Sequence, residues 1–319
     1  MTSDALLYRA GSGKRLLQAG AVYDVFISAF NLSERVTNTF ERVEAKRKYW
    51  VIHNEYCFDQ SELPSNASVL FSMETTEADF VIETLGQILP ALSAVQRVCI
   101  DITGFMRPHL MFLMKYLWAL GFTRFDLVYT EPSQYMRKAD TVFSSDVVEM
   151  RQINGFEGAH SVDMTDDVLV VGAGYDHDLI SHAIAYKSGA RLVQLLSLPS
   201  LSADMYQESL VRLHRVADAP LKVPEEQLAY SSANDPFTTY IVLEEAIHKL
   251  EERQQGISNL YLSPLATKPQ AVGFAMFYLK RLIGRPASIV FPFAKRYSKE
   301  TSRGVGRTWL YEMEFDSSI

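Results

Sequence analysis

The sequence predicts an α/β protein made of two Rossmann-like lobes with mainly parallel sheets. Short apolar runs alternate with longer segments of helical periodicity, which is typical of parallel strands joined by crossover helices. This alternation occurs four times, and its two halves can be superposed, which indicates an internal duplication. The length of 319 residues suits two domains of about 100 to 200 residues each.

The first lobe is expected to span residues 1–150 and to hold two strand-helix-strand units. One runs from residues 24–43 into residues 48–56, and the other runs from residues 98–121 into residues 125–132. In each unit an apolar run precedes polar and small residues, and a helical pattern follows them. Both units therefore predict a pair of neighbouring parallel strands.

The second lobe is expected to span residues 151–319. Its units run from residues 167–189 into 191–199 and from residues 259–284 into 287–297. Residues 199–258 between them are interpreted as a helical insertion. The boundary between the lobes is placed in residues 151–167, which contain glycines and clustered acids but no apolar periodicity.

Superposition of the halves pairs the loops that follow equivalent strands. An offset of 144 residues places residues 28–30 on residues 172–174, and an offset of 161 places Arg107-Pro108 on Lys268-Pro269. Proline is favoured in the first turn of a helix, where its missing N–H would have no partner. Each lobe is therefore expected to start one helix with a cation followed by a proline.

The composition excludes several classes of protein. Apolar residues make up 48% and charged residues 22% of the chain, as in packed globular proteins and unlike disordered ones. No apolar stretch approaches the roughly 20 residues that span a bilayer, and no secretory signal pattern is visible, so we expect a cytoplasmic location without membrane contact. A net charge of −7 makes direct nucleic-acid binding unexpected. Cys57 and Cys99 lack the spacing of a disulfide framework or zinc cluster.

Candidate ligand-binding residues follow the ends of the predicted strands, because open parallel sheets bind ligands outside the carboxyl ends of their strands. Helix N-termini with nearby cations there would form a cradle for an anion. In the first lobe the candidates are Asn31, Glu34, Arg35, Asp101, Thr103, Gly104 and Arg107. In the second lobe they are Gly174, Tyr175, Asp176, Ser263, Thr267, Lys268 and Arg296.

No cofactor is identified from the sequence, and no metal site is predicted. The segment GAGYDHD at 172–178 lacks the third glycine of the dinucleotide fingerprint, which argues against NAD bound in the standard manner. Asp176, His177 and Asp178 offer metal-binding groups, but no second acid-histidine cluster accompanies them in the sequence. His53, with Glu55 beside it, is the best acid-base candidate in the first lobe, and a buried structural histidine is the alternative.

The run RVCIDITGFMRPHLMFLMKYL at 97–117 resembles the strand-loop-helix step of CRISPR-associated Rossmann-fold (CARF) sensor domains. Two such lobes in one chain are similar to the SAVED domains of bacterial antiviral systems. The resemblance implies that Asp101, Thr103, Gly104 and Arg107 contact a cyclic oligonucleotide, with Ser263, Thr267 and Lys268 as their counterparts. The second copy, SPLATKP, lacks the aspartate and the glycine, so we expect two unequal half-sites.

The sequence thus predicts a soluble sensor or scaffold subunit of a bacterial antiviral defence system. Its ligand would be an anionic nucleotide-like molecule such as a cyclic oligonucleotide, and a protein partner would carry the output. The alternative is an enzyme that cleaves a nucleotide or an NAD-like cofactor, with Glu34, His53, Glu55, Asp101 or His177 in acid-base roles. YDVFIS at 23–28, which is similar to the first strand of TIR domains, belongs to this alternative. A purely structural subunit of a larger complex is a third possibility.

Overall fold

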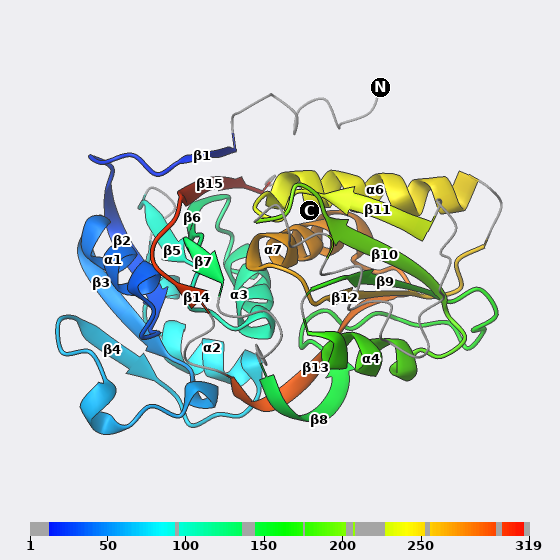
Figure 1. Ribbon diagram of the computed structural model, residues 1–319, viewed down its shortest axis with the longest axis horizontal. Helices are drawn as coiled ribbons and strands as arrows, with labels where there is room; N and C mark the ends of the chain where they lie inside the picture. The colour runs from blue at the N-terminus through cyan, green and yellow to red at the C-terminus, as the bar shows by residue number, and fades with distance from the viewer. Residues whose placement is uncertain are drawn as a thin grey trace. The chain divides into compact units, whose positions relative to one another are not determined.

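A computed structural model describes residues 13–92, 96–135, 144–174, 176–201, 207, 227–252, 256–297 and 302–315. The chain divides into two units, each built around its own sheet (Figure 1). The first unit comprises Met1–Ser145 together with Arg296–Ile319, and the second comprises Asp146–Lys295.

The first unit contains a seven-stranded sheet in the order β1-β15-β6-β5-β2-β3-β4. Strands β2 to β6 are parallel to one another, and β15 is antiparallel to both β6 and β1. Numbered along the chain, the parallel strands follow the order 3-2-1-4-5 of dinucleotide-binding folds. The strands are β1 (Lys14–Leu16), β2 (Val22–Ala29), β3 (Glu44–Ile52), β4 (Ser68–Phe71), β5 (Val98–Asp101), β6 (Arg124–Thr130) and β15 (Thr308–Glu314).

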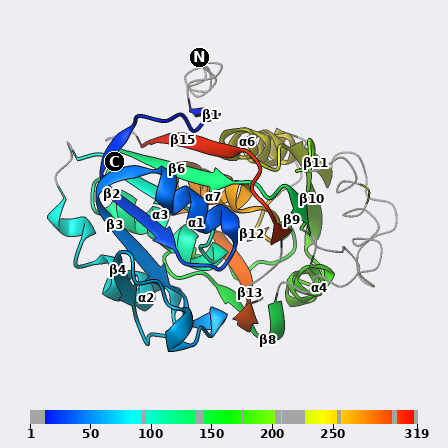
Figure 2. The ribbon, with the colours of Figure 1, turned by 60° about the vertical axis from the view of Figure 1, so that its left-hand side comes forward.

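Helices cover both faces of this sheet. Helix α1 (Glu34–Arg42) packs on β2, β5 and β6 (Figure 2), whereas α2 (Glu77–Leu85) packs beside α3 (Arg107–Ala119). The crossover through α1 moves from β2 toward β3, and the crossover through α3 moves the opposite way, from β5 to β6. Because such crossovers are right-handed, α1 and α3 lie on opposite faces of the sheet. Short 3-10 turns at Asn54–Tyr56, Gln60–Glu62 and Leu89–Ala91 complete the unit.

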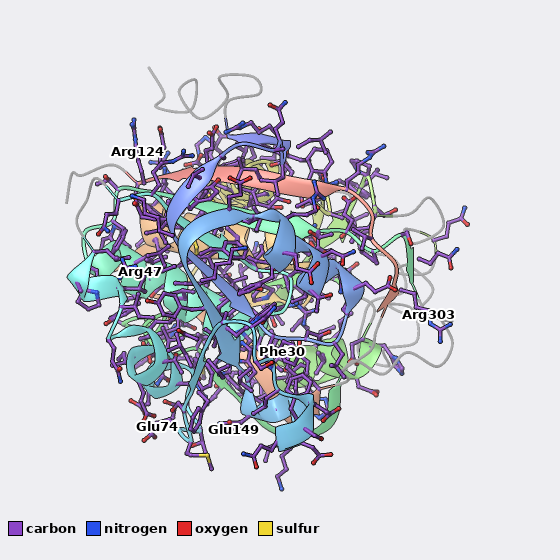
Figure 3. All side chains as sticks on the ribbon, turned by 90° about the vertical axis from the view of Figure 1, so that its left-hand side faces the viewer. Phe30, Arg47, Glu74, Arg124, Glu149 and Arg303 are labelled. Carbon is purple, nitrogen blue, oxygen red and sulfur yellow. The ribbon has the colours of Figure 1, made fainter. Side chains whose placement is uncertain are left out.

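An aromatic cluster anchors α1 to the sheet. Phe40 of α1 stacks on Trp50 of β3 at a centroid distance of 3.6 Å, and Phe30 meets the edge of Trp50 at 5.3 Å. Figure 3 places Phe30 near the middle of this unit and Arg124 and Glu74 toward its rim. Each fully buried aromatic or aliphatic side chain contributes about 1.5–3 kcal/mol to folding. This packing fixes where α1 begins, and α1 begins at the carboxyl edge of the sheet.

The second unit contains a six-stranded sheet in the order β11-β10-β9-β12-β13-β8. Strands β9 to β13 are parallel to one another and repeat the order 3-2-1-4-5. The strands are β8 (Ser144–Gln152), β9 (Val168–Gly172), β10 (Arg191–Ser197), β11 (Leu228–Ser231), β12 (Leu260–Pro264) and β13 (Ala287–Tyr297). The helices are α4 (His177–Tyr186), α6 (Pro236–Glu252) and α7 (Lys268–Phe277), and α7 continues into a π-helical turn at Tyr278–Leu282.

The prediction of two Rossmann-like lobes is confirmed. All four predicted strand-helix-strand units are present as β2-α1-β3, β5-α3-β6, β9-α4-β10 and β12-α7-β13, with parallel strands in each. The same strand order in both units is what an internal duplication would produce. Within the helical insertion expected at 199–258, α6 confirms the second helix, and most of the first, at 205–216, lies outside the described residues. The same range also holds β11, a strand that pairs in parallel with β10, so this part of the chain belongs to the sheet and is not purely helical.

The C-terminal segment departs from the sequence-based division, which assigned residues 151–319 to the second lobe. Residues 296–319 belong to the first unit, because β15 pairs along its whole length with the edge strand β6. A second antiparallel pair, β7 (Gln134–Tyr135) with β14 (Ser302–Arg303), lies in the same unit. The described part of the chain holds no helix that combines the length and the apolar character needed to cross a bilayer.

Candidate functional site

The candidate site lies at the carboxyl edge of the first sheet, between β2 and β5. These neighbouring strands send their connections to opposite faces, which makes this position the topological switch point where Rossmann-like folds bind ligands. The residues that follow β2 and β5 are residues 30–35 and 102–107. Six of the seven candidates in the first lobe lie in these two loops or in the helix turns that follow, and the seventh, Asp101, ends β5.

Asp101 and Thr103 hold the loop after β5 in place. Asp101 is fully buried, and its two carboxyl oxygens accept hydrogen bonds from the Ser28 hydroxyl and from the backbone N–H of Thr103, both at 2.9 Å. The Thr103 hydroxyl in turn accepts the N–H of Thr130 on β6 at 3.0 Å. These contacts give Asp101 and Thr103 a structural role in shaping the loop.

Gly104 brings the two loops of the switch point together. A Cβ atom at this position would lie 1.9 Å from the carbonyl oxygen of Ala29, a distance that no side chain can occupy. The carbonyl oxygen of Gly104 accepts a hydrogen bond from the Tyr56 hydroxyl at 3.1 Å. Glycine is therefore required here by the close approach of the loop after β5 to the end of β2.

The first turns of α1 and α3 both face this edge of the sheet. Neither helix start has a side-chain cap: Ser33 precedes α1, and Met106 precedes α3, without accepting an N–H bond from the first turn. The prediction of a cation-proline step in the first turn of a helix is confirmed for Arg107-Pro108. Thr103 lies three residues before the N-cap position of α3, which is Met106. Uncapped N–H groups stabilise an anion by about 0.3–1 kcal/mol for each helix.

Tyr56 is a buried residue whose pKa is affected by several polar candidates of the first lobe. Burial raises the pKa of Tyr56 to about 12, while a hydrogen bond with Asn31 and the charges of Arg35 and Arg107 act in the opposite direction. Asn31 and Arg35 come from the loop after β2 and the first turn of α1, and Arg107 opens α3 after β5. All three candidates therefore lie at the carboxyl ends of the neighbouring strands β2 and β5.

Two hydrogen bonds hold the Arg35 side chain in position. Its guanidinium donates to the Ser33 hydroxyl at 3.3 Å and to the carbonyl oxygen of Thr130 at 3.2 Å. Asn31 accepts the N–H of Ser33 at 2.9 Å, which shapes the turn into α1. Glu34, the remaining candidate in this loop, is the exposed first residue of α1.

Behind Tyr56 lies a cluster of two histidines and a glutamate that the sequence did not indicate as a unit. His53 follows β3, Glu55 lies in the next turn, and His109 is the third residue of α3. Potential metal-ligating atoms of the three side chains all lie within 4.8 Å of one another. His109 Nε2 is 3.6 Å from Glu55 Oε1, and both histidines are almost completely buried. This cluster could hold a divalent metal ion.

The equivalent edge of the second unit is built differently. Thr267, a predicted ligand-binding residue, caps α7 and forms a capping box with Gln270, and Lys268-Pro269 opens the helix as expected. Asp176 caps α4 by accepting the N–H of Leu179. Both helix starts are thus occupied by side chains of the protein itself, unlike those of the first unit.

The other candidates of the second lobe are dispersed. Gly174 approaches the Leu265 carbonyl oxygen so closely that a Cβ would lie 2.2 Å from it, which repeats the close approach seen at Gly104. Ser263 is fully buried on β12, and its hydroxyl has no hydrogen-bond partner among the described residues. Tyr175 lies outside the described residues, as does the side chain of Arg296.

The metal-binding possibility at residues 176–178 receives no geometric support from the described part of the chain. Asp176 is engaged as a helix cap, and His177 pairs with the exposed Asp178 at 3.5 Å. The only three-residue cluster of metal-binding side chains found among the described residues is His53, Glu55 and His109.

Comparison of the chain with protein-family models and with curated protein sequences finds no match.

Proposed function

We propose that the protein binds an anionic, nucleotide-like ligand at the switch point of its first unit. The observation that carries this proposal is the position of Arg35 and Arg107 in the first turns of α1 and α3, which follow the neighbouring strands β2 and β5 of the switch point. Two guanidinium groups and two uncapped helix starts concentrate positive potential at one edge of a protein whose net charge is −7.

A phosphate group is the anion that this arrangement suits best. Arginine offers two parallel N–H donors that match phosphate oxygens, and helix N-termini add backbone N–H groups on the same side. The strand order 3-2-1-4-5 supports a nucleotide in particular, because folds of this order bind the pyrophosphate at the helix start that follows the first strand. In this chain that helix is α1.

In our proposal the second unit has no equivalent anion site of its own. Its equivalent helices are closed by Thr267 with Gln270 and by Asp176, so their N–H groups already have acceptors. This difference supports a duplicated protein in which one half has kept the ligand site. Lys268 then serves as a natural comparison for Arg107.

In this proposal the protein acts as a cytoplasmic sensor or scaffold subunit of a bacterial antiviral defence system. The resemblance of residues 97–117 to CARF domains supports a cyclic oligonucleotide as the ligand, and a separate protein partner would carry the output.

The alternative, an enzyme acting on a nucleotide or an NAD-like cofactor, is favoured by one observation. His53, Glu55 and His109 lie at the same strand edge, and Glu55 is close enough to influence the pKa of Tyr56. A histidine-carboxylate cluster beside an anion site is a common arrangement for acid-base or metal-assisted hydrolysis.

Thermal unfolding with cyclic di-, tri- and tetranucleotides, NAD and ATP tests the proposal, because a ligand that binds the native state raises its stability. We expect at least one of these compounds to stabilise the protein. Arg107→Ala should weaken that binding by about tenfold or more, since a charge-assisted hydrogen bond contributes about 1.5–3 kcal/mol. Lys268→Ala is the matched control. It should leave the affinity within about twofold of the wild-type value, which is well below a tenfold change, equivalent to about 1.4 kcal/mol.

Chromatography of the same mixtures separates the sensor from the enzyme, since a sensor leaves the nucleotide intact. Lack of stabilisation by every compound in the panel would contradict the proposal.

A further inference from the structure

The cluster of His53, Glu55 and His109 has the composition of a transition-metal site with three protein ligands. Neutral imidazole nitrogens and a carboxylate oxygen are the ligands of many catalytic zinc sites, in which a fourth position stays open. Zinc bonds of about 2.0–2.2 Å in tetrahedral geometry place the ligand atoms about 3.3–3.6 Å apart. The distance of 3.6 Å between His109 Nε2 and Glu55 Oε1 already falls in this range.

The third ligand requires only a small adjustment. All the ligand atoms lie within 4.8 Å of one another, so side-chain rotations of about an ångström bring them to bonding distance from a common centre. His53 Nε2 accepts the N–H of Met106 at 3.4 Å, which means that this nitrogen carries a lone pair.

The surrounding side chains hold the two rings in place. Phe80 stacks on His53 at a centroid distance of 5.0 Å and meets His109 at 4.9 Å, and Phe105 meets the edge of His53 at 5.4 Å. The ring centroids of His53 and His109 are 4.6 Å apart. An apolar shell of this kind lowers the local dielectric constant around the two rings and strengthens metal-ligand electrostatics.

Glu55 distinguishes a metal site from simple packing of buried histidines. Its Oε2 atom is shielded from solvent and accepts no hydrogen bond from the described residues. A buried carboxylate oxygen without a partner costs free energy, which a metal ion would recover. The Glu55 side chain as a whole is 23% exposed, which leaves a route by which an ion can enter.

We propose that His53, Glu55 and His109 bind one divalent transition-metal ion of the zinc type, with an open coordination position. Two neutral imidazoles and one carboxylate would leave the bound ion with a net charge of about +1, from +2 and −1. A site with this charge suits an exchangeable water or an anionic oxygen as a further ligand. The metal site stands independently of the nucleotide proposal, because none of its three ligands is needed for binding at Arg35 and Arg107.

The test is equilibrium dialysis of the full chain, freed of metal with a chelator, against Zn²⁺, Co²⁺, Ni²⁺ and Mn²⁺, followed by elemental analysis. We expect one Zn²⁺ per chain and, with Co²⁺, the visible absorption bands of a four- or five-coordinate ion.

The test variant is Glu55→Gln, which keeps the shape of the side chain and removes its charge. It should lower metal affinity by more than about 100-fold, because loss of an outer-shell partner alone costs 10–100-fold. His248→Gln is the matched control. His248 forms an exposed ion pair with Glu252, and this pair supplies only two metal-binding side chains. The His248→Gln variant should leave the affinity unchanged.

Failure of the wild-type chain to bind any of the four ions in stoichiometric amount would overturn the proposal. Equal affinity of wild type and Glu55→Gln would overturn it as well. Because the wild-type stoichiometry and the Co²⁺ spectrum do not depend on a variant, the proposal stays testable if Glu55→Gln does not fold.

Discussion

The carboxyl group of Asp101 accepts a hydrogen bond at 2.9 Å from the hydroxyl of Ser28, its partner on the neighbouring strand at the switch point of the first unit. Both residues are fully buried, and the same carboxyl group accepts the backbone N–H of Thr103. The segment DITGFMRPHL at residues 101–110 therefore combines two roles. Its aspartate, threonine and glycine shape the loop, and Arg107 carries the charge that we assign to ligand binding.

We expect Asp101→Ala to lower the free energy of unfolding by about 3 kcal/mol, because it leaves two buried donors without an acceptor. Ser28→Ala should cost about 1–2 kcal/mol, and the two changes should not be additive. Urea denaturation of both variants and of the double variant measures the coupling. An Asp101→Ala variant of wild-type stability that no longer binds ligand would show instead that Asp101 contacts the ligand.

Gly104→Ala should destabilise the first unit by about 2 kcal/mol or more, because the added methyl group overlaps the carbonyl oxygen of Ala29. Gly189→Asn is the control. Gly189 has a positive φ of 95° but open space around it, and asparagine tolerates this backbone conformation, so a cost of at most about 1 kcal/mol is expected. Equal midpoints of urea unfolding for the two variants would disprove the steric argument.

Tyr56→Phe should lower the free energy of unfolding by about 1–2 kcal/mol at neutral pH, since the buried carbonyl oxygen of Gly104 loses its hydroxyl donor. Tyr186→Phe, at an exposed position, should have no measurable effect. In the wild type, the raised pKa of about 12 predicts a further dependence on pH. Stability should fall from about pH 10 to 12, where the unfolded tyrosine ionises and the folded one does not.

His160 should make the second unit sensitive to mild acid. Its ring stacks on Tyr261 at 4.7 Å, and Nδ1 lies 3.2 Å from Asn259 Oδ1. Burial lowers the pKa of His160 below 6.5, opposed by the bond with Asn259 and the charge of Asp167, while Lys187 lowers it further. The unfolded state therefore binds more protons below about pH 6.5, and stability should fall as the pH drops through this value.

Urea denaturation between about pH 5 and 8 measures this effect, because this pH range spans the ordinary histidine pKa of about 6.5. His160→Gln should flatten the dependence, and an unchanged slope would rule out His160 as its source.

The fold was predictable from the sequence to the extent that local patterns determine it. The four strand-helix-strand units follow from apolar periodicity, and Pro108 and Pro269 marked two helix starts to the residue. The return of residues 296–319 to the first unit was not predictable in this way. The pairing of β15 with β6 joins residues more than 170 positions apart, and a single edge strand leaves no local signal of which sheet it joins.

The candidate site was predictable only in part. Arg35 and Arg107 were identified because open parallel sheets bind ligands outside the carboxyl ends of their strands, and both residues follow such strand ends. Tyr56 and the cluster of His53, Glu55 and His109 were not identified as partners, since the register of β3 beside β2 and the turn after β3 bring them near α3. Two sequence features would indicate this cluster once the strand order is known. They are HNEY at 53–56 after an apolar run and His109 in the first turn of the helix after β5.

The most direct test of the account is hydrogen-deuterium exchange of the full chain with and without each nucleotide of the panel. The ligand site in the first unit predicts slower exchange in residues 31–37 and 103–110, the first turns of α1 and α3 with the loops before them. It also predicts unchanged exchange in residues 265–272, which form the equivalent start of α7 in the second unit. Protection confined to residues 265–272, or no protection in residues 31–37 and 103–110 with any nucleotide, would contradict the central claim.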